Sequence, residues 1–248
     1  MQIETEGLVI RERSVGESDR LITLLTKHEG VLRAFARRAK RVRSTQNSAT
    51  QLLCYSELSI FKGRDKYIIN DAQPREVFFG LRQDISRLSL AQYFCELAET
   101  LAPESAPAGD YLRLMLNSLH FLSGNLRPEL LLKSVVEMRM LAFSGYMPNL
   151  ICCAECACYE HDLMWFLPEE GILLCGNCYH PDRRKALPLS RGALTGLRHT
   201  IYAEFEKLFA FQLPREGLGQ MADAAEAFLL THIERQFQTL LFYKSLQG

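Results

Sequence analysis

The chain has 248 residues, enough for one large domain or two to three small ones with a sizeable buried core. With 48% hydrophobic and 23% charged residues, 9 Pro and 15 Gly, its composition excludes low-complexity disorder and collagen-like sequence and indicates a folded, soluble protein. Basic and acidic residues balance at 29 each, so no overall field attracts a polyanion.

No membrane span is expected. The longest stretch without Asp, Glu, Lys or Arg is 15 residues (140–154), and Gly and Pro interrupt it. The N-terminal sequence MQIETEGLVIRERS lacks the basic head and apolar run of a secretory signal, so a cytoplasmic protein is expected.

The balanced charge hides an asymmetry along the chain. Residues 1–80 contain 14 basic and 10 acidic residues, which leaves 15 and 19 for residues 81–248, so the two parts carry +4 and −4. A nucleic-acid surface is therefore expected in the first third.

Short runs rich in Val, Ile, Leu, Tyr and Thr, separated by turn-forming residues, fill the N-terminal region. They predict five strands, at 7–13, 20–26, 31–40, 52–61 and 66–70. Five strands with short connections favour a small closed barrel over an open sandwich, because closure removes the exposed edges. We therefore predict an OB-like barrel.

After Pro74 the apolar residues follow helical spacing. The predicted helices are 76–101; 111–122, capped by Asp110; a helix from Pro128 at its first position to near Gly145; a segment from the cap Ser190 to Phe211; and about 218–243. The predicted fold class is α+β multidomain, with an N-terminal five-stranded OB-like barrel, an α-helical bundle and an inserted four-cysteine zinc module. The corresponding domains are 1–75, 76–147 with 187–248, and 148–186.

Six of the eight cysteines fall between positions 152 and 178. Two C-x2-C pairs, Cys153 with Cys156 and Cys175 with Cys178, have the spacing of a four-thiolate zinc site, and the strand-like arm between them can form a hairpin that brings the two turns together. One structural Zn²⁺ is therefore predicted. A site with four protein ligands leaves no open position for water, which argues against catalysis by the metal.

Other interpretations of this window stay open. The thiols could be buried and bind no metal, and one of Cys152, Cys158, His161 or His180 could replace a predicted ligand.

A basic segment lies within a stretch, 30–56, that contains no acid. Its six cations are Arg33, Arg37, Arg38, Lys40, Arg41 and Arg43. On a strand that runs into a loop, such cations can follow a phosphate backbone, so this segment is the predicted DNA-binding site, with an ordinary solvated basic face as the alternative. A second, weaker cationic patch consists of Lys62, Arg64 and Lys66. Four aromatic residues of the barrel could stack on bases, but a core position explains each of them at least as well: Phe35, Tyr55, Phe61 and Tyr67.

No phosphate-binding glycine loop, HExxH motif or nucleophile elbow occurs in the sequence. His120, His199 and His232 fall in predicted helices, where structural roles explain them. A binding protein is therefore the simplest interpretation. The alternatives are a zinc-containing assembly scaffold that does not bind DNA directly and a zinc-dependent nucleic-acid enzyme, which needs an open coordination position.

Taken together, the motifs resemble the RecO family of bacterial recombination-repair mediators over essentially the whole chain. They are LVIRERSVGESD (8–19), LLTKHEG (24–30), RVRS (41–44), FSGYMPNL (143–150) leading into Cys153 and Cys156, GILLC (171–175) followed by Cys178, and HIERQFQTLLFY (232–243). Two departures stand out: Arg38 occupies a position where many members have Gly, and Cys152 and Cys158 are additional thiols.

The resemblance implies an OB domain, a helical bundle and a zinc module in a cytoplasmic, nucleoid-associated protein that is not an enzyme. It implies binding of single- and double-stranded DNA, annealing of complementary strands, and action with RecR to load RecA onto strands coated by single-strand-binding protein. It also implies docking of that protein's acidic C-terminal tail, for which Arg127, Lys133 and Arg139 of the helical region are candidate cations.

Overall fold

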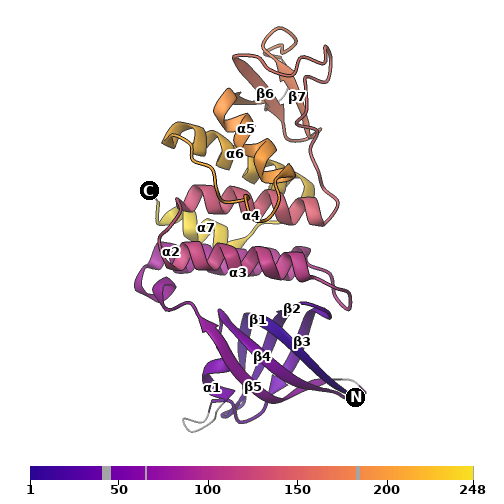
Figure 1. Ribbon diagram of the computed structural model, residues 1–248, viewed down its shortest axis with the longest axis vertical. Helices are drawn as coiled ribbons and strands as arrows, with labels where there is room; N and C mark the ends of the chain where they lie inside the picture. Colours follow the sequence, from indigo (N-terminus) through magenta and orange to yellow (C-terminus); the bar gives the residue numbers. More distant parts are fainter. Residues whose placement is uncertain (41–45, 65, 183–184, 248) are drawn as a thin grey trace. The chain divides into compact units, whose positions relative to one another are not determined.

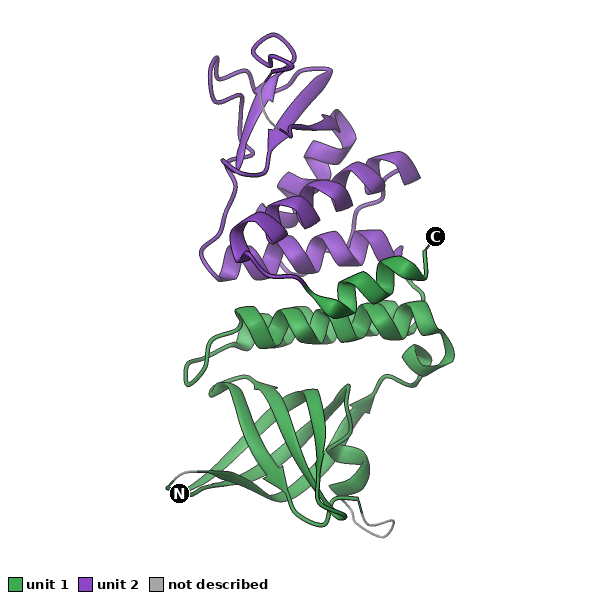
Figure 2. Ribbon diagram, turned by 180° about the vertical axis from the view of Figure 1, so that it is seen from behind, with its two compact units in different colours: residues 1–126, 237–248 green, residues 127–236 purple. Residues whose placement is uncertain are grey.

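The computed structural model describes residues 1–40, 46–64, 66–182 and 185–247. They form two compact units, Met1–Leu126 with Phe237–Gly248 (unit 1) and Arg127–Gln236 (unit 2), as Figure 2 shows. The division into the three predicted domains stays a prediction. Among the residues that the structure describes, no helix combines the length and apolar character needed to cross a membrane.

Unit 1 contains a closed five-stranded barrel (Figure 1). Its strands are β1 (Gln2–Val15), β2 (Asp19–Thr26), β3 (Gly30–Ala36), β4 (Cys54–Lys62) and β5 (Tyr67–Val77). They close in the order β1-β2-β3-β5-β4, with every pair antiparallel except β3 and β5. The predicted OB-like barrel is confirmed.

Apolar side chains fill the barrel because its strands alternate between inward and outward positions. In β4, for example, Ser56, Leu58 and Ile60 are buried while the residues between them are only partly covered. The interior is made of Ile3, Val9, Ile22, Leu24, Leu32, Ala34, Ala36, Ala39, Ala49, Leu58, Ile60, Ile69 and Ala72. Ala49 comes from the short helix α1 (Gln46–Ala49), which packs against β4 and β5.

Three strand boundaries differ from prediction by four or more residues. β1 begins at position 2 instead of 7, and β3 ends at Ala36, so residues 37–40 form a turn. β5 continues to Val77, which pairs with Cys54 on β4. Pairing across the barrel, which local propensity does not show, extends β1 and β5.

The helix predicted over 76–101 begins later than expected. A 3₁₀ helix, η1 (Phe79–Gln83), follows β5, and α2 runs from Ile85 to Leu101. The Asp84 carboxylate caps α2 by accepting hydrogen bonds from the backbone N–H groups of Ser86 (2.9 Å) and Arg87 (3.1 Å). This cap starts the helix nine residues after the predicted start.

The helices α2, α3 (Gly109–Ser123) and α7 (Gln238–Ser245) complete unit 1. α2 and α3 lie across one end of the barrel, and α7 packs against α2 (Figure 1). Ala108, not the predicted Asp110, is the N-cap of α3. Asp110 lies in the first turn, where its negative charge is favourable to the helix dipole.

Unit 2 contains α4 (Glu129–Phe143), α5 (Arg191–Tyr202) and α6 (Arg215–Ile233), with α4 packed against both other helices. Its sheet, in the order β7-β6-β8, consists of β6 (Leu163–Leu167), β7 (Ile172–Cys175) and β8 (Leu187–Ser190). The β6–β7 pair is the hairpin predicted between the cysteine pairs, and Ser190 caps α5 as predicted. Pro128 is the N-cap of α4, one position before its predicted place.

Two predicted helices in the C-terminal part are too long. α5 ends at Tyr202 instead of Phe211. The helix predicted over 218–243 is divided into α6 and α7, because Glu234 adopts a left-handed conformation (φ 48°) and ends α6.

Candidate metal centre and nucleic-acid interface

The four predicted cysteines lie together in unit 2. The Sγ atoms of Cys153, Cys156, Cys175 and Cys178 are all within 4.8 Å of one another, and those of Cys156 and Cys175 are 3.6 Å apart. Four thiolates bonded at ~2.3 Å to a tetrahedral ion have sulfur–sulfur separations of about 3.8 Å. The arrangement therefore fits a four-thiolate metal site.

Two tight turns place these sulfurs. The carbonyl of Cys153 accepts a hydrogen bond from the N–H of Ala157 (2.9 Å), and the carbonyl of Cys175 accepts one from the N–H of Cys178 (3.0 Å). The first turn is held beside β7 because the N–H of Ala154 donates to the carbonyl of Leu173 (2.8 Å). The hairpin thus brings two pairs that are distant in sequence to one point.

The electrostatics of the cluster favour a bound cation. Burial raises the pKa of Cys153, but backbone N–H groups, including those of Cys156 and Cys175, stabilise its thiolate and lower the pKa to about 6. Hydrogen bonds with Cys156 and Cys175 raise the pKa of Cys178 well above its usual range. Four adjacent thiols cannot all ionise unless a cation neutralises them, and thiolates select soft metals such as zinc.

The alternative ligands lie outside this cluster, which among the described residues contains the four cysteines alone. The Cys158 Sγ donates to the carbonyl of Glu160 (3.0 Å), and Nδ1 of His161 lies 3.1 Å from the carbonyl of Leu163. Cys152 is half-buried and His180 is exposed.

Four of the six predicted DNA-binding cations lie in described residues of the barrel. Arg33 is exposed on β3, while Arg37, Arg38 and Lys40 lie in the turn that follows it, the first two exposed and Lys40 half-buried. The remaining two, Arg41 and Arg43, lie outside the described residues.

Hydrogen bonds to the β1–β2 turn (16–18) and to Asp19, the first residue of β2, fix the start of this basic turn. The N–H of Arg38 donates to Asp19 Oδ1 (2.7 Å), which lowers the pKa of that carboxyl. The Lys40 N–H donates to the carbonyl of Ser18 (3.0 Å), and its Nζ donates to that of Gly16 (3.2 Å). Arg38 has a φ of 55°, in the left-handed region that glycine adopts without strain. The turn thus has a backbone conformation that favours glycine, although its residue is arginine.

Two further cations of this barrel face, Arg11 and Arg13, were not predicted from the sequence. Arg11 on β1 and Arg33 on β3 both pair with Thr23 on the intervening β2, so the three side chains form one row. A hollow of about 220 Å³ lies here, lined by Arg11, Arg13, Leu21, Thr23, Arg33 and Glu99. Only the strand register could have revealed this row.

Of the candidate aromatic residues, Phe35 lies on β3 two residues after Arg33 and is half-buried, whereas the weaker patch and the other three lie elsewhere on the barrel. Lys62 stacks over the ring of Tyr67 at 5.5 Å, and Phe61 is the most exposed of the four candidate aromatics. Tyr55 donates to Glu6 (2.8 Å), and burial together with this bond raises its pKa to about 12.

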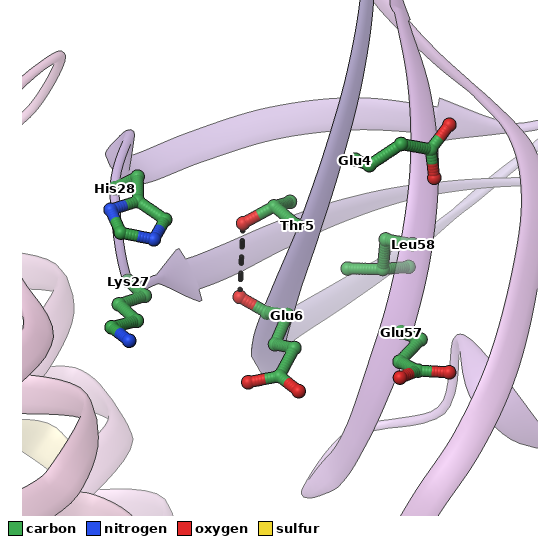
Figure 3. Close-up of a pocket in the computed structure, with 7 residues that line it drawn as sticks. All are labelled: Glu4, Thr5, Glu6, Lys27, His28, Glu57 and Leu58. Atoms are coloured by element: carbon green, nitrogen blue, oxygen red, sulfur yellow. Dashed lines mark hydrogen bonds between the residues drawn. The ribbon is translucent and has the colours of Figure 1, made fainter.

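A second hollow of the barrel, of about 460 Å³, has the wrong charge for nucleic acid (Figure 3). It is lined by Glu4, Thr5, Glu6, Lys27, His28, Glu57 and Leu58. Its three carboxylates lie on β1 and β4 and repel phosphates. The candidate nucleic-acid face is therefore the surface of β1, β2 and β3 with the turn after β3.

The three candidate cations of the helical region lie in different surroundings in unit 2. Arg127 Nε donates to the carbonyl of Phe209 (2.8 Å), and the Arg139 guanidinium donates to the carbonyls of Ile201 and Ala203 (2.5 and 2.6 Å). Lys133 is buried, so its ammonium is not available to an exposed rim.

Comparison with known proteins matches the N-terminal and C-terminal parts of the chain to the same protein family. Residues 1–78 match the family described as "Recombination protein O N terminal", and residues 82–241 match "Recombination protein O C terminal". The chain is 34% identical to the DNA repair protein RecO of Acetivibrio thermocellus over 98% of this chain and 97% of that protein. It is 32% identical to the protein of the same name from Symbiobacterium thermophilum, with 98% and 97% covered. With matches over both halves of its sequence, the chain belongs to the RecO family of DNA repair proteins.

Proposed function

We propose that this protein is a non-enzymatic mediator of recombinational DNA repair that binds single- and double-stranded DNA and anneals complementary strands. With RecR, it helps to load RecA onto strands coated by single-strand-binding protein. The observation that carries the proposal is the exposed pair Arg37 and Arg38, beside a row of arginines on a closed barrel, in a chain of the RecO family.

The charges of the barrel support DNA binding. Arg33, Arg37 and Arg38 are exposed and follow one another along β3 and its turn, so they can contact successive phosphates. Annealing needs two polyanions held close together, and arginines screen both while base pairing supplies the sequence specificity.

The cysteine cluster supports a structural role for a metal. Cys153, Cys156, Cys175 and Cys178 would hold one Zn²⁺, which would join two turns that otherwise depend on a short hairpin. Because the four thiolates fill a tetrahedral coordination shell, the site supports folding of the module and not catalysis. X-ray absorption is expected to show four sulfur neighbours, and an open position filled by oxygen would favour a zinc-dependent enzyme instead.

Docking of the acidic tail of single-strand-binding protein belongs to the same proposal. Of the three candidate cations, Arg127 and Arg139 are partly exposed and Lys133 is buried. The docking proposal therefore relies on the two arginines.

A labelled single-stranded oligonucleotide tests DNA binding. We expect binding at low salt and a steep decrease in affinity as salt rises. Replacing Arg37, Arg38 and Arg41 together by alanine should weaken binding and reduce the log–log salt slope by about 2, because each phosphate contact contributes ~0.7 on single strands. Arg75→Ala, which removes an exposed arginine of β5, is the control. No affinity of the unmodified protein at low salt would instead favour an assembly scaffold.

A further inference from the structure

Glu99, near the C-terminal end of α2, places its carboxylate between two arginines of the barrel. Its Oε2 lies 3.1 Å from Nη1 of Arg11, and its Oε1 lies 3.6 Å from Nη2 of Arg33. Since both arginines pair with Thr23 on β2, they belong to one row across three strands. The Glu99 carboxylate thus faces two cations that come from β1 and β3, while the more exposed Glu104 lies 3.9 Å from Nη1 of Arg33 alone.

The arginines remain accessible while the carboxylate lies beneath them. Their side chains are each 56% exposed, whereas that of Glu99 is 18% exposed. The hollow that they line measures about 220 Å³, room for several water molecules of about 30 Å³ each. A small anion can therefore reach both guanidinium groups from solvent.

Backbone hydrogen bonds hold the connection after α2 against the barrel. The N–H of Val31 donates to the carbonyl of Pro103 (2.9 Å), and the N–H of Ala108 donates to that of Lys27 (3.0 Å). The contact is close because Gly30 has no side chain: a Cβ there would lie 2.1 Å from the Pro103 oxygen. The distance between Glu99 and the arginine row is thus set by the main chain.

We propose that this hollow is a phosphate-binding subsite of the DNA-binding face and that Glu99 occupies the place of the phosphate when DNA is absent. The inference rests on the proposed function. A carboxylate and a phosphodiester both offer two oxygens to the fork of an arginine, so they compete for the same N–H groups. Glu99 keeps Arg11 and Arg33 together, and its charge weakens the binding of an isolated phosphate.

The competition has a consequence for the length of strand that is bound. One phosphate must displace Glu99 at a cost, whereas a longer strand that also contacts Arg37 and Arg38 offsets this cost with further contacts. The subsite therefore favours extended strands over short fragments and free phosphate.

The test measures binding of a fluorescein-labelled oligothymidine to the full chain and to Glu99→Gln, which keeps the size of the side chain and removes its charge. We expect affinity to rise about three- to tenfold at constant salt and the log–log salt slope to steepen by about 0.7 to 1.4, for one or two additional phosphate contacts. Arg11→Ala with Arg33→Ala should weaken binding and abolish the gain from Glu99→Gln.

Two matched variants control for charge alone. Glu57→Gln and Arg75→Ala remove the members of an ion pair on β4 and β5 whose arginine is also 56% exposed. Both should bind like the unmodified protein. Circular dichroism of each variant checks the fold. A second variant, Glu99→Asp, withdraws the carboxylate by one methylene and should also bind the oligothymidine more tightly than the unmodified protein does.

A Glu99→Gln protein that binds no more tightly than Glu57→Gln would overturn the inference. So would a gain that persists after both arginines are removed. In either case the proposed function survives if the unmodified protein binds and the triple Arg37, Arg38, Arg41 variant binds more weakly. Absence of binding by every variant at low salt would instead refute the proposed function.

Discussion

Nζ of Lys133 lies 2.9 Å from Oε1 of Glu137, one turn further along α4, and the two side chains are 3% and 0% exposed. The same ammonium lies 2.9 Å from Oε2 of Glu226 on α6. Burial disfavours the charged form, but attraction to the two carboxylates outweighs it and raises the pKa of Lys133. The ion pairs thus join α4 and α6 within unit 2.

Lys133→Met should strongly destabilise the protein, because it leaves a buried carboxylate without its lysine. Breaking a buried pair in this way costs about 3–5 kcal/mol, which urea unfolding measures. Lys207→Met, at an exposed lysine of the same unit, should stay within about 0.5 kcal/mol of the unmodified protein. Equal stability of the two variants would contradict this account of Lys133.

Cys175→Ser should lower both the metal content and the thermal stability, because metal binding is coupled to folding of the cysteine module. Elemental analysis and a thermal melt, with and without a chelator, measure the two effects. Cys158→Ser is the matched control, since this thiol is close in sequence but outside the cluster. An unmodified protein without zinc, or equal loss in both variants, would be incompatible with the predicted ligand set.

Asp84→Ala should cost about 1 kcal/mol at neutral pH through loss of the α2 cap. The hydrogen bond from the Arg87 backbone N–H lowers the pKa of Asp84 below its ordinary value of 3.8. A lowered carboxyl pKa contributes stability above 3.8 that is lost as the pH falls through the folded-state value.

The difference between Asp84→Ala and the unmodified protein should therefore be constant near neutrality and shrink below pH 3.8. Asp84→Asn keeps a capping oxygen without the charge, so its stability relative to Asp84→Ala should not change over this range. Denaturant titrations at several pH values distinguish the three proteins, and a pH-independent cost of Asp84→Ala would show that charge plays no part.

Gly30→Ala should destabilise the protein more than Gly16→Ala does. Both glycines have positive φ, 66° and 58°, but a Cβ at Gly16 has nothing within 4 Å, whereas one at Gly30 would meet the carbonyl oxygens of Pro103 and Ala106. Gly16→Ala thus measures conformational strain alone, and Gly30→Ala adds displacement of the connection after α2. We expect a lower melting temperature for Gly30→Ala, and equal melting temperatures would mean that the contact is not needed.

Features that depend on near neighbours in the sequence could be predicted. The strand-like segments, the cap at Ser190 and the two C-x2-C turns are all local, and the structure contains each of them. The spacing between the two cysteine pairs also limits the length of the hairpin that joins the turns, so it predicted which four sulfurs come together.

Features that depend on pairing between distant segments could not be predicted. The arginine row exists because β2 brings Arg11 and Arg33 opposite the same residue, after an irregularity in β1 between Val9 and Arg11 that changes the register. Lys133 has the spacing of a surface cation, yet Glu226, on a helix distant in sequence, makes its burial possible. The apolar residues likewise keep helical spacing on both sides of Glu234, although the positive φ of Glu234 ends α6 there.

The return of the chain to unit 1 has a consequence for the order in which the protein folds on the ribosome. Phe237, at the start of α7, packs edge-on against Tyr93 of α2 at 5.8 Å, and both rings are buried. Unit 2 is encoded between the two segments of unit 1, so its sequence is complete before α7 has been synthesised. Tyr93 of α2 therefore lacks its contact with Phe237 until α7 has been synthesised, and a chain truncated before residue 237 leaves the side of α2 that α7 covers exposed to solvent.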